Sequence, residues 1–239
     1  MPARTHPDHV CQSGIQSRTS TTGITLIRQF SIRLLCCLFV CLSYSCSQTD
    51  EQTTYPSLIT EFAELYADAD GNICQMRPDR KPTYYLASPL RGYHPHTEYR
   101  AACTYAFSGN DSTTVRIYGL ERVVVLQDST QQSYPGTDPL QVVSLWDGGD
   151  FINLHLSVKT QSGTQHWGYR MDSIRITAQQ KRIAYLTLYH NQNNDPLSYS
   201  EKVYASLPKN SLKAVIEPGD SICLQINTFA GKNSWKFVY

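Results

Sequence analysis

The sequence predicts an all-β protein, and three observations support this fold class. Short runs rich in Val, Ile, Thr and Tyr are separated by clusters of Gly, Pro, Asn and Asp, which is typical of strands joined by turns. Tyrosine is frequent, with 16 residues against 7 phenylalanines, and its ring suits half-exposed sheet faces. Residues 151–159 alternate strictly, and one face of this segment carries the apolar side chains Ile152, Leu154, Leu156 and Val158.

Residues 25–46 predict a secretory signal peptide ahead of the folded part. Arg28 and Arg33 precede an apolar run, residues 34–42, which stops at small residues before Cys46. This run is much shorter than a membrane-spanning helix, which needs about 20 residues. A buried strand or a short helix is the alternative interpretation of the segment.

The end of this segment resembles a bacterial lipobox, with LSYSC at residues 42–46. The resemblance implies that residues 1–46 are a leader and lipoprotein signal peptide, and that lipidated Cys46 anchors the mature chain in a membrane. A polar tether, residues 47–55, follows, and its acidic pair at 50–51 resembles the export signal of surface-exposed lipoproteins of the Bacteroidetes. We therefore expect a lipid-anchored protein of the cell envelope, at the outer membrane and displayed outward.

The charge and cysteine patterns argue against two classes of function. Beyond residue 46 the chain has 17 basic and 19 acidic residues, so it lacks the broad positive surface that nucleic acid binding requires. Of the eight cysteines, Cys74, Cys103 and Cys223 lie in this part, and they lack the paired spacing of a structural zinc site. We expect no nucleic-acid partner, no metal and no cofactor.

Residues 56–128 contain strand candidates at short intervals, which predicts a small barrel. Residues 58–66 are ambiguous, because Leu58, Phe62 and Leu65 follow helical spacing, whereas the tight-turn signal that follows is typical of a hairpin. These residues alone leave helix and strand open. The clearer candidates are residues 73–76, 83–86, 99–107, 113–118 and 123–126.

Residues 129–140 are rich in Pro, Gly, Ser and Gln, which predicts a linker between two domains. Residues 141–239 then carry about five strands with turns at short intervals, which predicts an antiparallel β-sandwich. A hairpin turn is expected at residues 161–164. The apolar alternation places strands at residues 151–159, 169–177, 184–188, 222–226 and 235–239.

Several motifs spread over the chain resemble the NigD-like lipoprotein family of the Bacteroidetes. The N-terminal motifs are PSLITEFAELYADADGN and TEYRAACTYAF, and the C-terminal motifs are SLWDGGDFINLHL and LTLYHNQNNDP. The resemblance implies an OB-fold domain followed by a β-sandwich, and it favours a strand at residues 58–66. The family takes its name from proximity to a bacteriocin system, which implies an immunity role.

A basic and aromatic patch is the first candidate ligand site. It comprises Arg77, Arg80, Lys81, Tyr84 and Tyr85, and on an OB-fold such a surface can hold an oligosaccharide or an oligonucleotide. The resembling proteins carry an acidic, Gly-containing turn here, so a shared role for this loop does not follow. An envelope location favours a glycan or protein partner, and the alternative is a solvated charged turn beside a core strand.

Two motifs carry side chains of the kind that bind metals. His94 and His96 could supply two imidazoles, but no third ligand is near in the sequence, so a solvated loop is the alternative. Asp147 and Asp150 flank two glycines, which could indicate calcium, although a calcium site needs six or more oxygens. The preferred interpretation is a tight turn or bulge that leads into the next strand.

Three histidines are the candidates for acid–base chemistry. His155, His166 and His190 could converge in space, but no nucleophile motif such as GxSxG accompanies them. We therefore expect that the protein is not an enzyme, and a hydrolase is the alternative.

Two cysteines of the first domain fall on strand candidates that we expect to be neighbours. An oxidising compartment permits a disulfide between Cys74 and Cys103. Two buried free thiols are the other interpretation of the pair.

The lipid tether, the two β domains and the missing catalytic motif together favour a non-enzymatic binding or interaction module. One version is a bacteriocin-associated, immunity-like protein that recognises an unknown protein or glycan partner. A structural accessory subunit of an outer-membrane assembly is the second hypothesis. A hydrolase that acts on surface polymers is the third.

Overall fold

Strands make up almost all of the regular structure. The computed structural model describes residues 56–109, 111–133 and 136–239, which contain twelve strands and one short 3₁₀ helix, η1 (Lys209–Leu212). The all-β fold class is therefore confirmed. Within these ranges no helix has the length and apolar character needed to cross a membrane. The predicted signal peptide, the lipidation at Cys46 and the tether lie outside the described residues.

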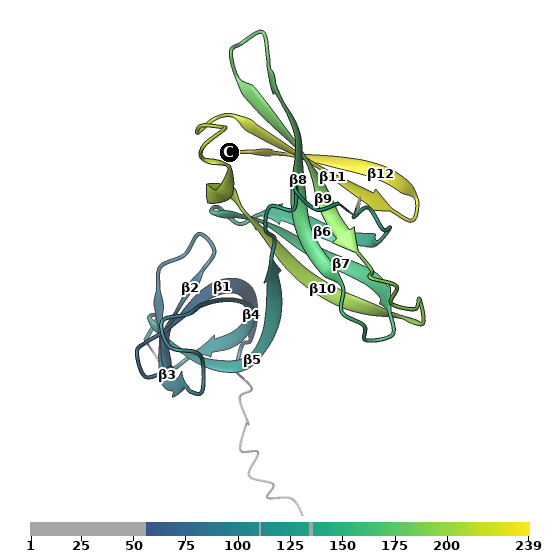
Figure 1. Ribbon diagram of the computed structural model, residues 1–239. Helices are drawn as coiled ribbons and strands as arrows, with labels where there is room; N and C mark the ends of the chain where they lie inside the picture. The colour runs from purple at the N-terminus through teal and green to yellow at the C-terminus, as the bar shows by residue number, and fades with distance from the viewer. Residues whose placement is uncertain (1–55, 110, 134–135) are drawn as a thin grey trace, which may run out of the picture. The chain divides into compact units, whose positions relative to one another are not determined.

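The first five strands close into a small barrel (Figure 1). β1, β2 and β3 form an antiparallel meander, β4 pairs with the other edge of β1, and β5 pairs antiparallel with β4. β5 also pairs parallel with β3, which closes the circle in the strand order of an OB-fold. The bounds are β1 (Ile59–Ala67), β2 (Ile73–Pro78), β3 (Tyr84–Leu90), β4 (Glu98–Phe107) and β5 (Thr114–Val125).

The ambiguous segment at residues 58–66 is a strand, and β1 is buried on both faces along part of its length. Leu65 belongs to the barrel core, whereas Phe62 lies on the opposite face in a separate cluster with Ala102 and Val123. Apolar residues on both faces break the simple alternation of a half-buried strand. This explains why the spacing of Phe62 and Leu65 resembled that of a helix.

The remaining strands form two packed sheets. β6 (Gln141–Asp147), β7 (Phe151–Thr160) and β10 (Tyr199–Pro208) are in the first sheet, and β10 also pairs with the last residues of β5. The second sheet has the order β12-β11-β9-β8. Its strands are β8 (His166–Ile176), β9 (Arg182–Asn191), β11 (Ser221–Thr228) and β12 (Gly231–Val238).

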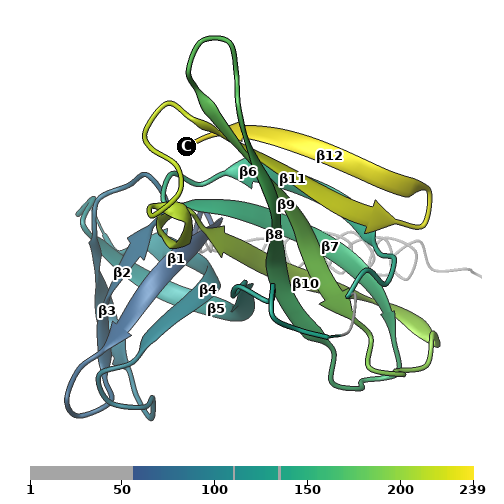
Figure 2. The same cartoon turned by 45° about the horizontal axis from the view of Figure 1, so that its top comes forward.

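This arrangement is the predicted sandwich, with two corrections (Figure 2). The pairings β5–β10 and β9–β11 are parallel, so the sandwich is not purely antiparallel. Residues 161–164 are not a hairpin turn, because β7 and β8 belong to different sheets. This loop instead carries the chain from one sheet to the other. A local turn signal in the sequence is the same for such a loop and for a hairpin.

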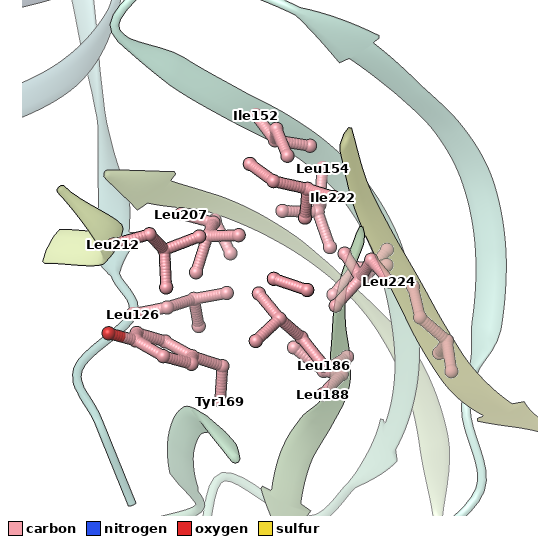
Figure 3. Close-up of a cluster of buried hydrophobic side chains, with 14 of the residues drawn as sticks. Leu126, Ile152, Leu154, Tyr169, Leu186, Leu188, Leu207, Leu212, Ile222 and Leu224 are labelled. Atoms are coloured by element: carbon pink, nitrogen blue, oxygen red, sulfur yellow. The ribbon is translucent and has the colours of Figure 1, made fainter. Parts of the chain in front are cut away.

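The sandwich core is built from the inward faces of both sheets. Figure 3 shows Ile152 and Leu154 from β7 and Leu207 from β10 directed toward Leu186 and Leu224 from the opposing sheet, and all five are buried. Each such side chain contributes about 1.5–3 kcal/mol when it is removed from water. The alternation read from the sequence therefore identified this core.

The segment predicted as a linker runs along the sandwich. Single bridges join Thr137 to His190 and Leu140 to Thr228, and Leu140 is completely buried. Residues 56–239 form one compact unit. The segment is thus attached to the sandwich, and the boundary between two domains remains a prediction.

Candidate functional site

Two motifs that the sequence singled out lie against each other. They are the basic turn between β2 and β3 and the WDGGD turn between β6 and β7. Arg80 forms an ion pair with Asp147 at 2.9 Å, and Arg77 Nη1 lies 3.4 Å from Asp150. The place where they meet, which we call the junction, therefore joins the barrel to the sandwich.

The centre of the junction is a buried polar network around Arg100. Its guanidinium Nη2 donates to Asp79 at 2.8 Å and to Asn153 Oδ1 at 3.1 Å, while Nε donates to Ser206 Oγ at 3.3 Å. The guanidinium carbon also lies 3.8 Å from the centre of the Phe151 ring. A buried cation that is paired, hydrogen-bonded and stacked holds its neighbours in one geometry.

Gly148 permits the close approach that this network needs. A Cβ atom at this position would lie 2.3 Å from Asp79 Oδ2 and 2.4 Å from Asn153 Nδ2. Both distances are far below a normal contact, so a larger residue would force these groups apart. The tight turn predicted for the two glycines is present, because Gly148 N–H bonds to Phe151 C=O and Gly149 has a φ of +88°.

The basic and aromatic patch does not form one surface. All three cations are held in ion pairs. Arg77 pairs with Glu64 and Asp150, Arg80 pairs with Asp147, and Lys81 pairs with Glu61. Tyr84 is buried in the barrel core, whereas Tyr85 is exposed on the opposite face of β3. Adjacent residues of a strand point to opposite faces, so the two rings cannot serve the same ligand.

A cavity of about 390 Å³ opens beside the ion pairs of the junction. A row of rings forms one wall: Trp146 lies 5.0 Å from Phe62, Phe62 lies 5.1 Å from Tyr204, and Tyr204 lies 4.9 Å from His155, between ring centres. Trp146 is 37% exposed, whereas Phe62 is buried. The remaining lining comes from Thr60, Glu61, Asp79, Arg80, Asp147 and Gly148.

Asp147 and Asp150 are occupied by cations of the protein itself. Asp147 accepts hydrogen bonds from Lys209 at 2.9 Å and from the Gly149 N–H at 2.8 Å. Burial acts to raise the pKa of Asp147, but these bonds and Arg80 outweigh it, so the pKa lies below its usual value. The geometry supports the turn interpretation rather than calcium, and no cluster of three candidate metal ligands occurs among the described residues.

His94 and His96 belong to a hydrogen-bonded loop of the barrel. The His94 N–H donates to the Tyr99 hydroxyl at 2.9 Å, and His96 Nδ1 lies 3.3 Å from the Tyr66 hydroxyl. His96 has a φ of +54°, so the backbone turns sharply here. The solvated-loop interpretation fits this geometry.

The three histidines do not converge. His155 lies on β7, in one sheet, whereas His166 and His190 lie on β8 and β9 of the other. Both ring nitrogens of His190 are occupied, by Asp138 C=O at 3.0 Å and by Gln165 Oε1 at 2.9 Å. Burial lowers the pKa of His190 against the opposing effect of Asp138, and the two hydrogen bonds give the ring a structural role.

The motif that follows His190 also has a structural role. Asp195 accepts a hydrogen bond from Thr160 and others from the backbone N–H groups of Gln161 and Gly163. Gln165 also donates to it at 2.9 Å. These bonds lower the pKa of Asp195 to about 2, and the bond from Thr160 has the largest effect. The carboxylate thereby fixes the loop that carries the chain between the two sheets.

The possible disulfide is not formed. Cys74 is exposed on β2, Cys103 is buried on β4, and both are free thiols. β1 lies between these two strands, so the expectation that they are neighbours is wrong. Strands two positions apart are separated by about 9.6 Å, which exceeds the Cα distance that a disulfide spans.

The sequence analysis identified only some of the residues that build the junction. Asn153 lies on the face of its strand opposite Ile152 and Leu154, where the alternation predicts solvent, but it is completely buried, as is Ser206 on β10. Arg100, which is also buried, sits in an otherwise apolar run, and a charge in such a run is the one signal that could have identified it.

Comparison with known proteins identifies the class of the C-terminal part. Residues 122–239 match the family model of the NigD-like C-terminal beta sandwich domain. The match begins inside β5, whose last residues pair with the sandwich strand β10. No curated protein matches the chain.

Solved structures with the same fold come from related bacteria. A NigD-like immunity protein from Bacteroides caccae is 24% identical, with a TM-score of 0.58, and the match covers 77% of this chain and 98% of that one. A protein from Parabacteroides distasonis, provisionally described as toxin-related, is 15% identical with a TM-score of 0.60 and coverages of 77% and 93%. A protein provisionally described as a lipoprotein, from Bacteroides fragilis, is 9% identical with a TM-score of 0.58 and coverages of 77% and 98%.

The barrel followed by a sandwich thus defines a two-part all-β protein of a type found in the Bacteroides group. Residues 122–239 are a NigD-like C-terminal β-sandwich domain, and the chain shares its fold with a NigD-like immunity protein. The resemblance noted in the sequence motifs is confirmed.

Proposed function

We propose that this protein is a non-enzymatic, lipid-anchored binding protein of the cell envelope, and that the junction is its recognition surface. The observation that carries the proposal is the cavity beside the Arg100 network, because its aromatic wall and its ion pairs come from both the barrel and the sandwich. A preformed pocket with a few convergent polar groups is the usual form of a binding site.

The engagement of the polar groups supports a binding role over catalysis. Asp79, Asp147 and His190 each hold structural partners, and a general base needs a free lone pair directed at its substrate. The signal peptide and the lipobox ending at Cys46 support the anchor and the envelope location. The outer membrane and outward display remain part of the proposal.

Immunity to a bacteriocin is a second candidate function, favoured by the name of one structural neighbour. The protein from Bacteroides caccae is a NigD-like immunity protein. Such a role requires a polypeptide partner in the envelope.

The anchor is tested by labelling growing cells with an alkyne analogue of palmitate. The wild-type chain is expected to take up the label and to fractionate with membranes, and the Cys46→Ser variant is expected to lose both properties. Cys41→Ser, five residues earlier in the same leader, is the matched control and should remain labelled. Label on the Cys46→Ser chain would contradict the proposed anchor.

The recognition surface is tested by photo-crosslinking in cells of the native host. A photoreactive phenylalanine analogue at Trp146 is expected to give an adduct of higher mass with an envelope component. The same analogue at Ile176, which is 67% exposed at the end of β8, serves as the control and should give none. Equal adducts at both positions, or none at Trp146, would contradict the assignment of the junction.

A further inference from the structure

The junction cavity combines an aromatic wall with charged groups that are already neutralised. Trp146 presents an accessible ring at the cavity, backed by the buried Phe62 ring at 5.0 Å. Tyr204 and His155 extend this wall and are half-buried. Flat apolar rings beside hydrogen-bonding groups suit a ligand that has both an apolar face and a polar edge.

The charges of the cavity favour a neutral ligand. Glu61 is paired with Lys81 and also accepts from the Tyr105 hydroxyl at 3.0 Å, and Asp147 is paired with Arg80 and Lys209. A cationic ligand would have to displace a protein cation from each carboxylate, and an anionic ligand would be repelled by the carboxylates. Paired groups of this kind still accept and donate additional hydrogen bonds through their remaining lone pairs and N–H groups.

His155 adds a neutral donor and acceptor at the far end of the ring row. Burial lowers the pKa of His155, and the nearby Lys202 acts in the same direction against the opposing Glu121. A neutral imidazole has one N–H donor and one acceptor nitrogen. Thr60, two residues before Phe62 on β1, contributes a hydroxyl to the lining.

We propose that the junction cavity binds a neutral carbohydrate, with a sugar ring against Trp146 and its hydroxyl groups bonded to Arg80, Asp147 and Thr60. This inference rests on the proposed function and names the ligand class of the same surface. A sugar ring has an apolar C–H face and a rim of hydroxyl groups that both donate and accept, which matches this lining. The volume of about 390 Å³ lies in the range of small-ligand pockets, ~300–1,000 Å³.

The test titrates the full chain, purified in mild detergent, with neutral trisaccharides: maltotriose, mannotriose, cellotriose and xylotriose. Calorimetry reports affinity, and a change in tryptophan fluorescence that is present in wild type and lost in Trp146→Ala reports on Trp146. We expect at least one trisaccharide to bind, and we expect Trp146→Ala and Arg80→Ala to weaken it at least ~10-fold. Arg80 is 60% exposed in its side chain, so its variant tests the site without disturbing the core.

The controls separate this proposal from the more general one. Trp235→Phe changes a tryptophan of the sandwich that does not line this cavity and should leave binding unchanged. Absence of binding by every trisaccharide at ~10 mM, or unchanged binding in both cavity variants, would overturn the carbohydrate assignment. Binding of trilysine in place of the sugars would also overturn it. An adduct at Trp146 in the crosslinking experiment would still support the recognition surface in either case.

Discussion

Asn153 donates a hydrogen bond from Nδ2 to Asp79 Oδ2 at 2.6 Å, which joins the loop after β2 to strand β7. The two residues are 74 positions apart in the sequence. Arg100 bonds to both of them, so the barrel and the sandwich share one buried polar network.

Asp79→Asn should destabilise the folded chain by ~3 kcal/mol, because it leaves the buried Arg100 cation without a counter-charge. Urea denaturation at pH 7 measures the change. Asp150→Asn is the matched control: its carboxylate is 74% exposed and lies 3.4 Å from Arg77, so its loss should cost less than about 1 kcal/mol. Equal losses for the two variants would show that the Arg100 network does not hold the junction.

Gly148→Ala should lower stability by ~1–3 kcal/mol, because its Cβ would meet Asp79 and Asn153 at 2.3 and 2.4 Å. Gly119→Ala on β5 is the control, because a Cβ there meets Thr104 at an ordinary 3.6 Å. This control should be neutral or slightly stabilising. The Tm values of both variants are compared in thermal melts. An unchanged Tm for Gly148→Ala would contradict the close approach of Asp79 and Asn153 to Gly148.

Asp195 should make stability depend on acid pH. Its pKa of about 2 in the folded chain lies below the value of about 3.9 in an unfolded chain. The unfolded state therefore binds the proton first, so this stabilisation is complete above about pH 5 and is lost as the pH falls toward 2. Asp195→Asn should melt several degrees lower than wild type at pH 7.

The prediction for Asp195 is tested by the difference in Tm between wild type and Asp195→Asn. The gap in Tm should narrow steadily between about pH 5 and pH 2, because wild type alone loses the contribution of the carboxylate. A gap that stays constant over this range would mean that the carboxylate of Asp195 is not what the loop depends on.

Cys74 and Cys103 should differ sharply in reactivity. Burial raises the pKa of Cys103 to about 12, and the thiolate is the reactive form, so this thiol should resist iodoacetamide at pH 8. Cys74 is exposed and should be alkylated in the folded protein. Peptide mass mapping before and after unfolding in urea measures both, and a crosslinked Cys74–Cys103 peptide in a non-reduced digest would contradict the structure.

Local pattern was sufficient for much of the fold. The alternation of Ile152, Leu154 and Leu156 on β7 correctly identified a strand and its buried face, because side-chain direction in a strand has a period of two. The turn at Asp70-Gly71-Asn72 was also predicted correctly, because Gly71 adopts a φ of +73° that few other residues accept. Resemblance to a family, rather than spacing, decided that residues 58–66 form a strand.

The candidate site depended on contacts that no local pattern contains. Arg77, Arg80 and Lys81 read as a free basic patch, but their counter-charges lie on β1 and on the WDGGD turn. The cavity between these elements was therefore absent from the sequence analysis. Its aromatic wall needs Phe62, Trp146 and Tyr204, which come from three separate strands.

The sequence by itself determined many of the strands, though not β6 or β10, together with the inward faces of the sandwich and the prediction of an exported lipoprotein. Only the tertiary structure decided that Asn153 and Arg100 are buried, that Cys74 and Cys103 lie apart, and that two charged turns neutralise each other. The physical reason is that alternation reports the two faces of one strand. Which element packs against the polar face of a strand depends on chain segments far away in the sequence. The ion pairs formed between the two elements then decide which charged groups are neutralised.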